Sequence, residues 1–79
     1  MLTYEEIDAL LKLAVKLSVR SVKQIAAESG INADTLYKWK TMVRNLSPQN
    51  MDRLMLYFME KEPQAIIAAY AANYVLTYL

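Results

Sequence analysis

Apolar side chains recur every three or four positions along most of this 79-residue chain, which is the spacing of one face of an α-helix. Over residues 4–18 this stripe consists of Ile7, Leu10, Leu11, Ala14 and Leu17. Over residues 48–61 it consists of Met51, Leu54, Met55 and Phe58. No segment shows the sustained period-two alternation that is typical of a strand. The pattern therefore predicts an all-α chain.

Helix-boundary signals divide the chain into five helices. Short polar side chains that cap helix N-termini occur at four places, which are Thr3, Ser21, Asn32 and Ser47. Gly30 is expected to end the second helix, because glycine adopts the left-handed conformation without a steric penalty. Pro63 separates the fourth helix from the fifth. We therefore expect a compact five-helix domain with helices over residues 4–18, 22–29, 33–43, 48–61 and 63–79.

The two short central helices each have an apolar inner face. We expect this inner surface to consist of Val22, Ile25, Ala26, Leu36, Trp39 and Val43. Because Trp39 falls within this stripe, we expect it in the core and not on a surface that stacks against bases.

The composition argues against an enzyme. The chain has no Cys and no His, so it lacks thiol nucleophiles, Cys–His zinc sites and the usual proton shuttle at neutral pH. Its single Gly excludes the phosphate-binding loops that need several glycines. We therefore expect no catalytic residue, no metal and no cofactor. Glu5, Glu6 and Asp8 stand where a signal peptide needs basic residues, and we expect a cytoplasmic protein.

The net charge of +1 conceals an uneven distribution. Residues 12–44 contain seven basic and two acidic residues, which gives this segment a net charge of +5. Residues 1–11 carry a net charge of −3 and residues 45–79 a net charge of −1. A positive central segment is what a phosphate-binding surface requires. The alternative is that these charges lie on solvated helix faces that bind nothing.

Residues 21–40 combine an expected helix, the turn Ser29-Gly30-Ile31-Asn32 and a second expected helix. This segment resembles the bacterial helix-turn-helix signature. The Leu46-Ser47-Pro48 start of the next helix extends the similarity to the lambda-repressor/Cro-like (XRE) family. The resemblance implies that the second helix of the motif enters the DNA major groove, while the first helix lies across the backbone.

The resemblance also implies two sets of DNA-contacting residues. The candidates for contacts to base edges are Asn32, Ala33, Asp34, Tyr37 and Lys38. The candidates for contacts to phosphates are Ser21, Lys23, Thr35, Lys40, Thr41 and Arg44. Phosphate contacts set the affinity, and base contacts set the choice of sequence. Asp34 departs from the basic character of such a surface, because a carboxylate accepts from cytosine but repels phosphate.

The last stretch of the chain is apolar on every side. Residues 64–79 contain no charge, and 13 of these 16 residues are apolar. A 16-residue helix rises only about 24 Å, which is too short for a bilayer core of about 30 Å, so we expect no membrane span. One side is expected to pack on the first and fourth helices through Ile67, Tyr70, Ala71, Tyr74 and Tyr78. The candidates for a homodimer interface are Ile66, Ala69, Tyr70, Asn73, Leu76 and Leu79.

These features together predict a homodimeric, double-stranded DNA-binding transcriptional regulator. We expect a repressor from a bacterium, a phage or a mobile element. Because 79 residues leave no room for a separate ligand domain, regulation would act through dimerisation or a partner. Residues 1–62 would carry the DNA-binding helices, and residues 63–79 the helix for dimerisation or the core. The alternative is a protein-interaction module on the same scaffold, such as an antirepressor or an anti-CRISPR-type inhibitor. Asp34 and the nearly neutral net charge favour this alternative.

Overall fold

The computed structural model describes the backbone of residues 2–78 and the side chains of residues 2–73. It contains the helices α1 (Tyr4–Leu17), α2 (Val22–Ser29), α3 (Ala33–Lys40), α4 (Pro48–Lys61) and α5 (Pro63–Tyr78). Within the described backbone there is no strand. The prediction of an all-α, five-helix chain is therefore confirmed.

The helix starts follow from local hydrogen bonds. Thr3 and Glu6 form a reciprocal capping box, in which the Glu6 backbone N–H donates to Thr3 Oγ1 at 3.2 Å. The side chains of Ser21, Asn32 and Ser47 each accept from the backbone N–H three residues later. Such caps satisfy N–H groups that have no partner within the helix. All four predicted N-caps are confirmed.

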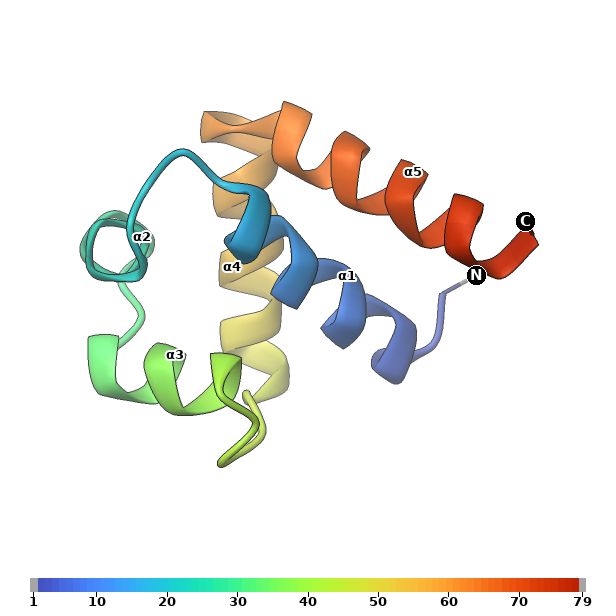
Figure 1. The fold of residues 1–79 in the computed structure, drawn as a ribbon. Coiled ribbons are helices and arrows are strands. Elements are labelled where there is room, and N and C mark those ends of the chain that lie inside the picture. The colour runs from blue at the N-terminus through green and yellow to red at the C-terminus, as the bar shows by residue number, and fades with distance from the viewer. Residues whose placement is uncertain (1, 79) are drawn as a thin grey trace.

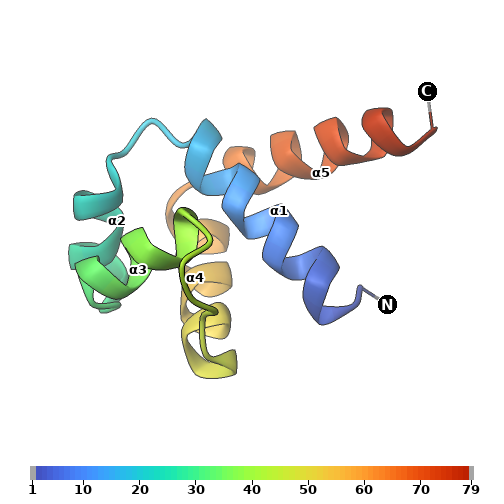
Figure 2. The same cartoon turned by 60° about the horizontal axis from the view of Figure 1, so that its bottom comes forward.

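The helices enclose one core, and α1 lies across both α4 and α5 (Figure 1). The pair formed by α2 and α3 lies to one side of these longer helices (Figure 1). The largest apolar side chains with almost no exposed surface come from four of the five helices and from the loop before α4, and they are Leu11, Ile25, Leu36, Trp39, Leu46, Leu54 and Phe58. Trp39 is thus a core residue, as predicted. Turned by 60°, the view shows α5 diverging from α1 toward its C-terminal end (Figure 2).

Two residues predicted for the core lie on the surface instead. Helix α3 ends at Lys40 and not at Val43, because Met42 adopts a positive φ of 65° that interrupts the helix. Val43 is consequently 70% exposed. At the end of α1, Leu17 is exposed and Val15 takes the buried position. The predicted stripe was therefore wrong at the last turn of each of these two helices.

The predicted orientation of α5 was also wrong. Ala65 is buried, whereas Ile67 is 68% exposed and Tyr70 is 55% exposed. Of the predicted homodimer contacts, Ala69 is buried and Ile66 packs against the core, so these two predictions were wrong. Ala71 is exposed as well, Asn73 is exposed, and the side chains of Tyr74, Leu76 and Tyr78 and the whole of Leu79 lie outside the described residues. Small alanine side chains let α5 lie close to α1, so they face the core in place of the larger residues. Across residues 2–78, no helix combines the length and apolar character needed to cross a bilayer.

Candidate nucleic-acid interface

The pair α2–α3 is built around a tight connection of three residues. Gly30 ends α2 with a φ of 80°, and its N–H donates to the Ala26 carbonyl at 3.1 Å. Ile31 then points into the core, and Asn32 caps α3 by accepting from the Thr35 N–H at 3.1 Å. The left-handed conformation of Gly30 turns the chain sharply enough for the two short helices to pack on each other.

One face of α3 points away from the molecule. The five base-contact candidates, Asn32, Ala33, Asp34, Tyr37 and Lys38, are all exposed. Tyr37 is 58% exposed, so its ring is available to a partner. The opposite face of α3 is fixed by the buried Leu36 and Trp39. The structure therefore brings these five candidates together on one accessible surface.

An ion pair crosses this exposed face. Lys38 Nζ lies 3.0 Å from Asp34 Oδ2, one helical turn away. The pair is largely solvated, so it contributes little to stability. Its electrostatic effect on a partner is larger, because Asp34 cancels the charge that Lys38 would offer to a phosphate or to a base acceptor.

The phosphate candidates divide into accessible and engaged groups. Lys23, Lys40 and Arg44 are exposed cations. The Ser21 hydroxyl is the N-cap of α2, and the Thr41 hydroxyl donates to the Tyr37 carbonyl at 3.0 Å. Such hydroxyls keep only part of their hydrogen-bonding capacity for a phosphate. A sixth candidate, Thr35, is partly buried.

Trp39 joins α3 to α1 by a polar contact that the sequence did not suggest. Its indole Nε1–H donates to Asp8 Oδ1 at 2.6 Å. The other oxygen of Asp8 lies 2.8 Å from Lys12 Nζ, which in turn sits 5.5 Å from the centre of the Trp39 ring. A buried indole N–H needs such an acceptor. Asp8 therefore holds the back of α3 in place.

A buried carboxylate holds the connection between α1 and α2. Glu62 is only 1% exposed and accepts from the Ser18 hydroxyl at 2.8 Å and the Val19 N–H at 3.1 Å. Arg20 Nη1 lies 2.8 Å from the same carboxylate. Burial raises the pKa of Glu62, but these three donors outweigh it and hold the pKa below its ordinary value. Glu62 is therefore ionised and fully paired.

The same network continues to α2. Arg20 Nε lies 3.6 Å from Glu28, and the Tyr57 hydroxyl donates to Glu28 at 2.6 Å. The Tyr57 hydrogen bond lowers the pKa of Glu28. Burial, together with this hydrogen bond, raises the pKa of Tyr57 to about 12. These groups fix α2 against α4, and none of them was singled out from the sequence, since the hydrogen bonds of Glu62 and that of Tyr57 to Glu28 span 29 to 44 positions along the chain.

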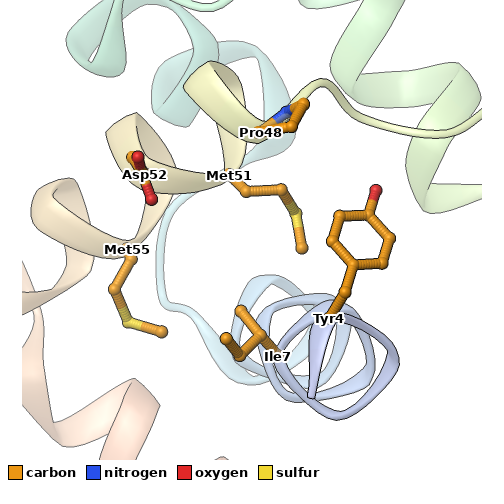
Figure 3. A pocket seen from close by; sticks show the side chains of 6 residues that line it. All are labelled: Tyr4, Ile7, Pro48, Met51, Asp52 and Met55. Carbon is orange, nitrogen blue, oxygen red and sulfur yellow. The ribbon is translucent and has the colours of Figure 1, made fainter. Parts of the chain in front are cut away.

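A hollow of about 170 Å³ opens between the start of α1 and the first half of α4 (Figure 3). Tyr4 and Ile7 of α1 face Met51 and Met55 of α4 across it (Figure 3). The Tyr4 hydroxyl is engaged, because it donates to the Leu46 carbonyl at 2.8 Å. Among the described residues that line this hollow, Asp52 is the one carboxylate, so they offer no pair of groups for general acid–base chemistry.

The likeness to helix-turn-helix proteins depends on the local pattern of residues 21–40 and the start of α4. No protein-family model, no curated protein and no solved structure matches this chain significantly. Membership of the lambda-repressor/Cro-like family therefore stays a prediction.

Proposed function

We propose that this chain binds double-stranded DNA by inserting the exposed face of α3 into the major groove. The observation that carries this proposal is the pairing of α2 and α3 through Gly30, with Leu36 and Trp39 turned inward and Tyr37 and Lys38 turned outward. An α-helix fits the major groove, which is about 12 Å wide. The positive charge of residues 12–44 supports the proposal, since phosphates dominate the affinity of such proteins.

Transcriptional repression is the proposed use of this binding. A domain that only occupies DNA can act by excluding other proteins from the same site. On palindromic DNA it would bind as a homodimer, with the two copies of α3 about 34 Å apart. The exposed side of α5, with Ile67, Tyr70 and Ala71, is the proposed dimer contact. It carries no charge, so two copies meeting around a two-fold axis would not repel each other.

The test of DNA binding is fluorescence anisotropy with a duplex selected from a random pool. Lys38→Ala is expected to weaken binding between about fivefold and a hundredfold, the range for loss of a specific base contact. Lys23→Ala is expected to weaken binding equally across sequences, as loss of a phosphate contact does. Lys61→Ala is the matched control, because Lys61 lies at the end of α4 that is remote from α3 (Figure 1). If no duplex binds tightly at moderate salt, the proposal is wrong.

Binding of a protein is the second candidate function for the same region. The observation that favours it is the exposure of Met42, at 79%, and of Val43, at 70%, in the loop after α3. Val43 lies near Lys38, because its N–H donates to the Lys38 carbonyl at 2.8 Å, and Lys38 is neutralised by Asp34. A protein partner would bind this surface with little dependence on salt, whereas DNA affinity falls steeply as salt increases. A salt titration therefore separates the two functions.

A further inference from the structure

Three lysines from two helices line one hollow beside the candidate interface. Lys12 and Lys16 of α1 and Lys40, the last residue of α3, line an open surface hollow of about 370 Å³ together with Ala9 and Leu13. We call this space the lysine hollow. It is many times larger than the volume of about 30 Å³ that one water molecule occupies, so it admits a phosphodiester group. Lys16 and Lys40 are far apart in the sequence, so the sequence pattern does not predict this arrangement.

The charges of the lysine hollow are only partly compensated. Lys12 is paired with Asp8 at 2.8 Å and lies over the Trp39 ring. Lys16 and Lys40 make no ion pair within the side chains that the structure describes. Lys12 and Lys16 are one helical turn apart, and like charges at this spacing repel each other. An anion in the hollow would reduce this repulsion, and a single phosphodiester charge would offset one of the two unpaired lysine charges.

The location of the hollow connects it with α3. Lys40 follows Tyr37 by three residues, so its side chain flanks the exposed face of the helix. The C-terminal end of α3 approaches α1, and Lys40 lies there beside the lysines of α1 (Figure 2). A duplex held by α3 would therefore present its sugar–phosphate backbone to one side of the helix, next to these lysines.

We propose that the lysine hollow binds a backbone phosphate of nucleic acid, so that α1 extends the footprint of α3. This inference rests on the proposed function and deepens it, because it assigns a phosphate contact to residues outside the helix pair α2–α3. Lys16 and Lys40 supply the charge, and Lys12, held by Asp8, forms a fixed wall. The same chemistry would accept a free phosphate ion, and the test separates the two sources.

The first measurement is the salt dependence of duplex affinity for the double variant Lys16→Gln and Lys40→Gln. Loss of one phosphate contact is expected to reduce the slope of log K against log salt by about 0.9. Over a tenfold change in salt, the variant then loses about eightfold less affinity than the unmodified protein. The matched control is the double variant Arg53→Gln and Lys61→Gln on α4, which removes the same charge. An unchanged slope in the first variant, with normal duplex binding, would overturn the inference and leave the proposed function standing.

The second measurement is an NMR titration of the unmodified chain and both variants with pyrophosphate at low salt. We expect amide shifts in residues 9–16 and at Lys40, and their loss in the Lys16/Lys40 variant. If pyrophosphate binds there while the duplex slope is unchanged, the hollow holds a free anion and the nucleic-acid assignment is wrong. If the unmodified chain binds no duplex, the proposed function fails with it, whatever pyrophosphate does. If neither ligand binds the hollow, the inference is wrong, and its lysines interact only with the C-terminal ends of α1 and α3.

Discussion

Met42 has a backbone conformation that suits glycine. Its φ of 65° lies in the left-handed region, which costs an L-residue roughly 1–2 kcal/mol. Its side chain is mostly exposed, so little packing compensates for this cost. Strain of this kind is frequent at binding sites, and Met42 lies two residues after the end of α3, the candidate recognition helix.

Replacing Met42 by glycine is expected to stabilise the protein. Met42→Gly should raise the free energy of unfolding by about 1 kcal/mol, because it removes the strain from the folded protein. The greater freedom that glycine gives the unfolded chain offsets part of this gain. Urea denaturation measures this change. Gly30→Ala is the opposite control, since Gly30 has a φ of 80° and an added Cβ would meet no atom within 4 Å. It should lower stability by about 1 kcal/mol. A destabilised Met42→Gly variant would contradict the strain argument.

Asp34 is expected to limit affinity for DNA. Asp34→Asn removes a charge that repels phosphate and releases Lys38 from its ion pair at 3.0 Å. An exposed pair of this kind is worth up to about 1 kcal/mol, so duplex affinity should rise by up to about fivefold. Anisotropy at fixed salt measures the change. Asp52→Asn, at an exposed position on α4, provides the control. Weaker binding after Asp34→Asn would instead indicate a direct contact from its carboxylate to a base.

At the scale of elements, the connection between α1 and α2 depends on Glu62. Its carboxylate accepts from Ser18 and Val19 and is paired with Arg20. Glu62→Gln keeps the shape but removes the charge, and is expected to cost about 2 kcal/mol of stability. Thermal or urea unfolding followed by circular dichroism measures the loss. Glu60→Gln, an exposed neighbour on α4, should leave stability nearly unchanged.

The effect of Glu62 should also depend on pH. Its pKa in the folded protein is held below the ordinary value of 4.5. A carboxyl with a lowered folded pKa stabilises the protein above the unfolded value, and this stabilisation is lost as pH falls through the folded value. The stability difference between the unmodified protein and Glu62→Gln should therefore be full at pH 7 and shrink below pH 4.5. A difference that stays constant down to pH 3 would contradict the assignment of Glu62 as a buried anion.

The elements predicted best are those with local signals. The starts of α1 to α4 follow from Thr3, Ser21, Asn32 and Ser47, whose caps depend only on residues three positions away. The end of α3 was not predicted correctly, because neither Met42 nor its immediate neighbours are residue types that favour a left-handed conformation. The face of α5 was missed because a helix that is apolar on every side has no stripe to orient it.

Within the candidate site, the helical period predicted which side chains are exposed. It did not predict which side chains contact each other. The pattern placed Tyr37 and Lys38 opposite Leu36 and Trp39, as observed. It could not show that Asp8 accepts from Trp39 or that Lys40 and Lys16 line the same hollow, because both depend on how α3 lies on α1. Tertiary packing alone creates them.

At the scale of the whole molecule, the exposed side of α5 predicts self-association. Ile67→Glu should shift the protein from dimer to monomer, because a charge buried against its own copy is unpaired. Sedimentation equilibrium over a range of concentrations measures this shift. Leu56→Glu, at a similarly exposed apolar position on α4, is the matched control. An unmodified protein that is monomeric at all concentrations, or an Ile67→Glu variant that still dimerises, would contradict the proposed interface.

Trp39 is the only tryptophan in the chain, and this makes the junction of α3 and α1 visible to optical spectroscopy. Its indole is dry, hydrogen-bonded to Asp8 and overlain by the Lys12 ammonium. Emission from this ring therefore reports the electric field at the back of the helix, while a ligand on the front of α3 never touches it. An anion that binds beside Lys12 would alter that electric field without exposing the indole ring to water. The protein thus carries an intrinsic fluorophore that distinguishes occupation of the lysine hollow from unfolding of α3.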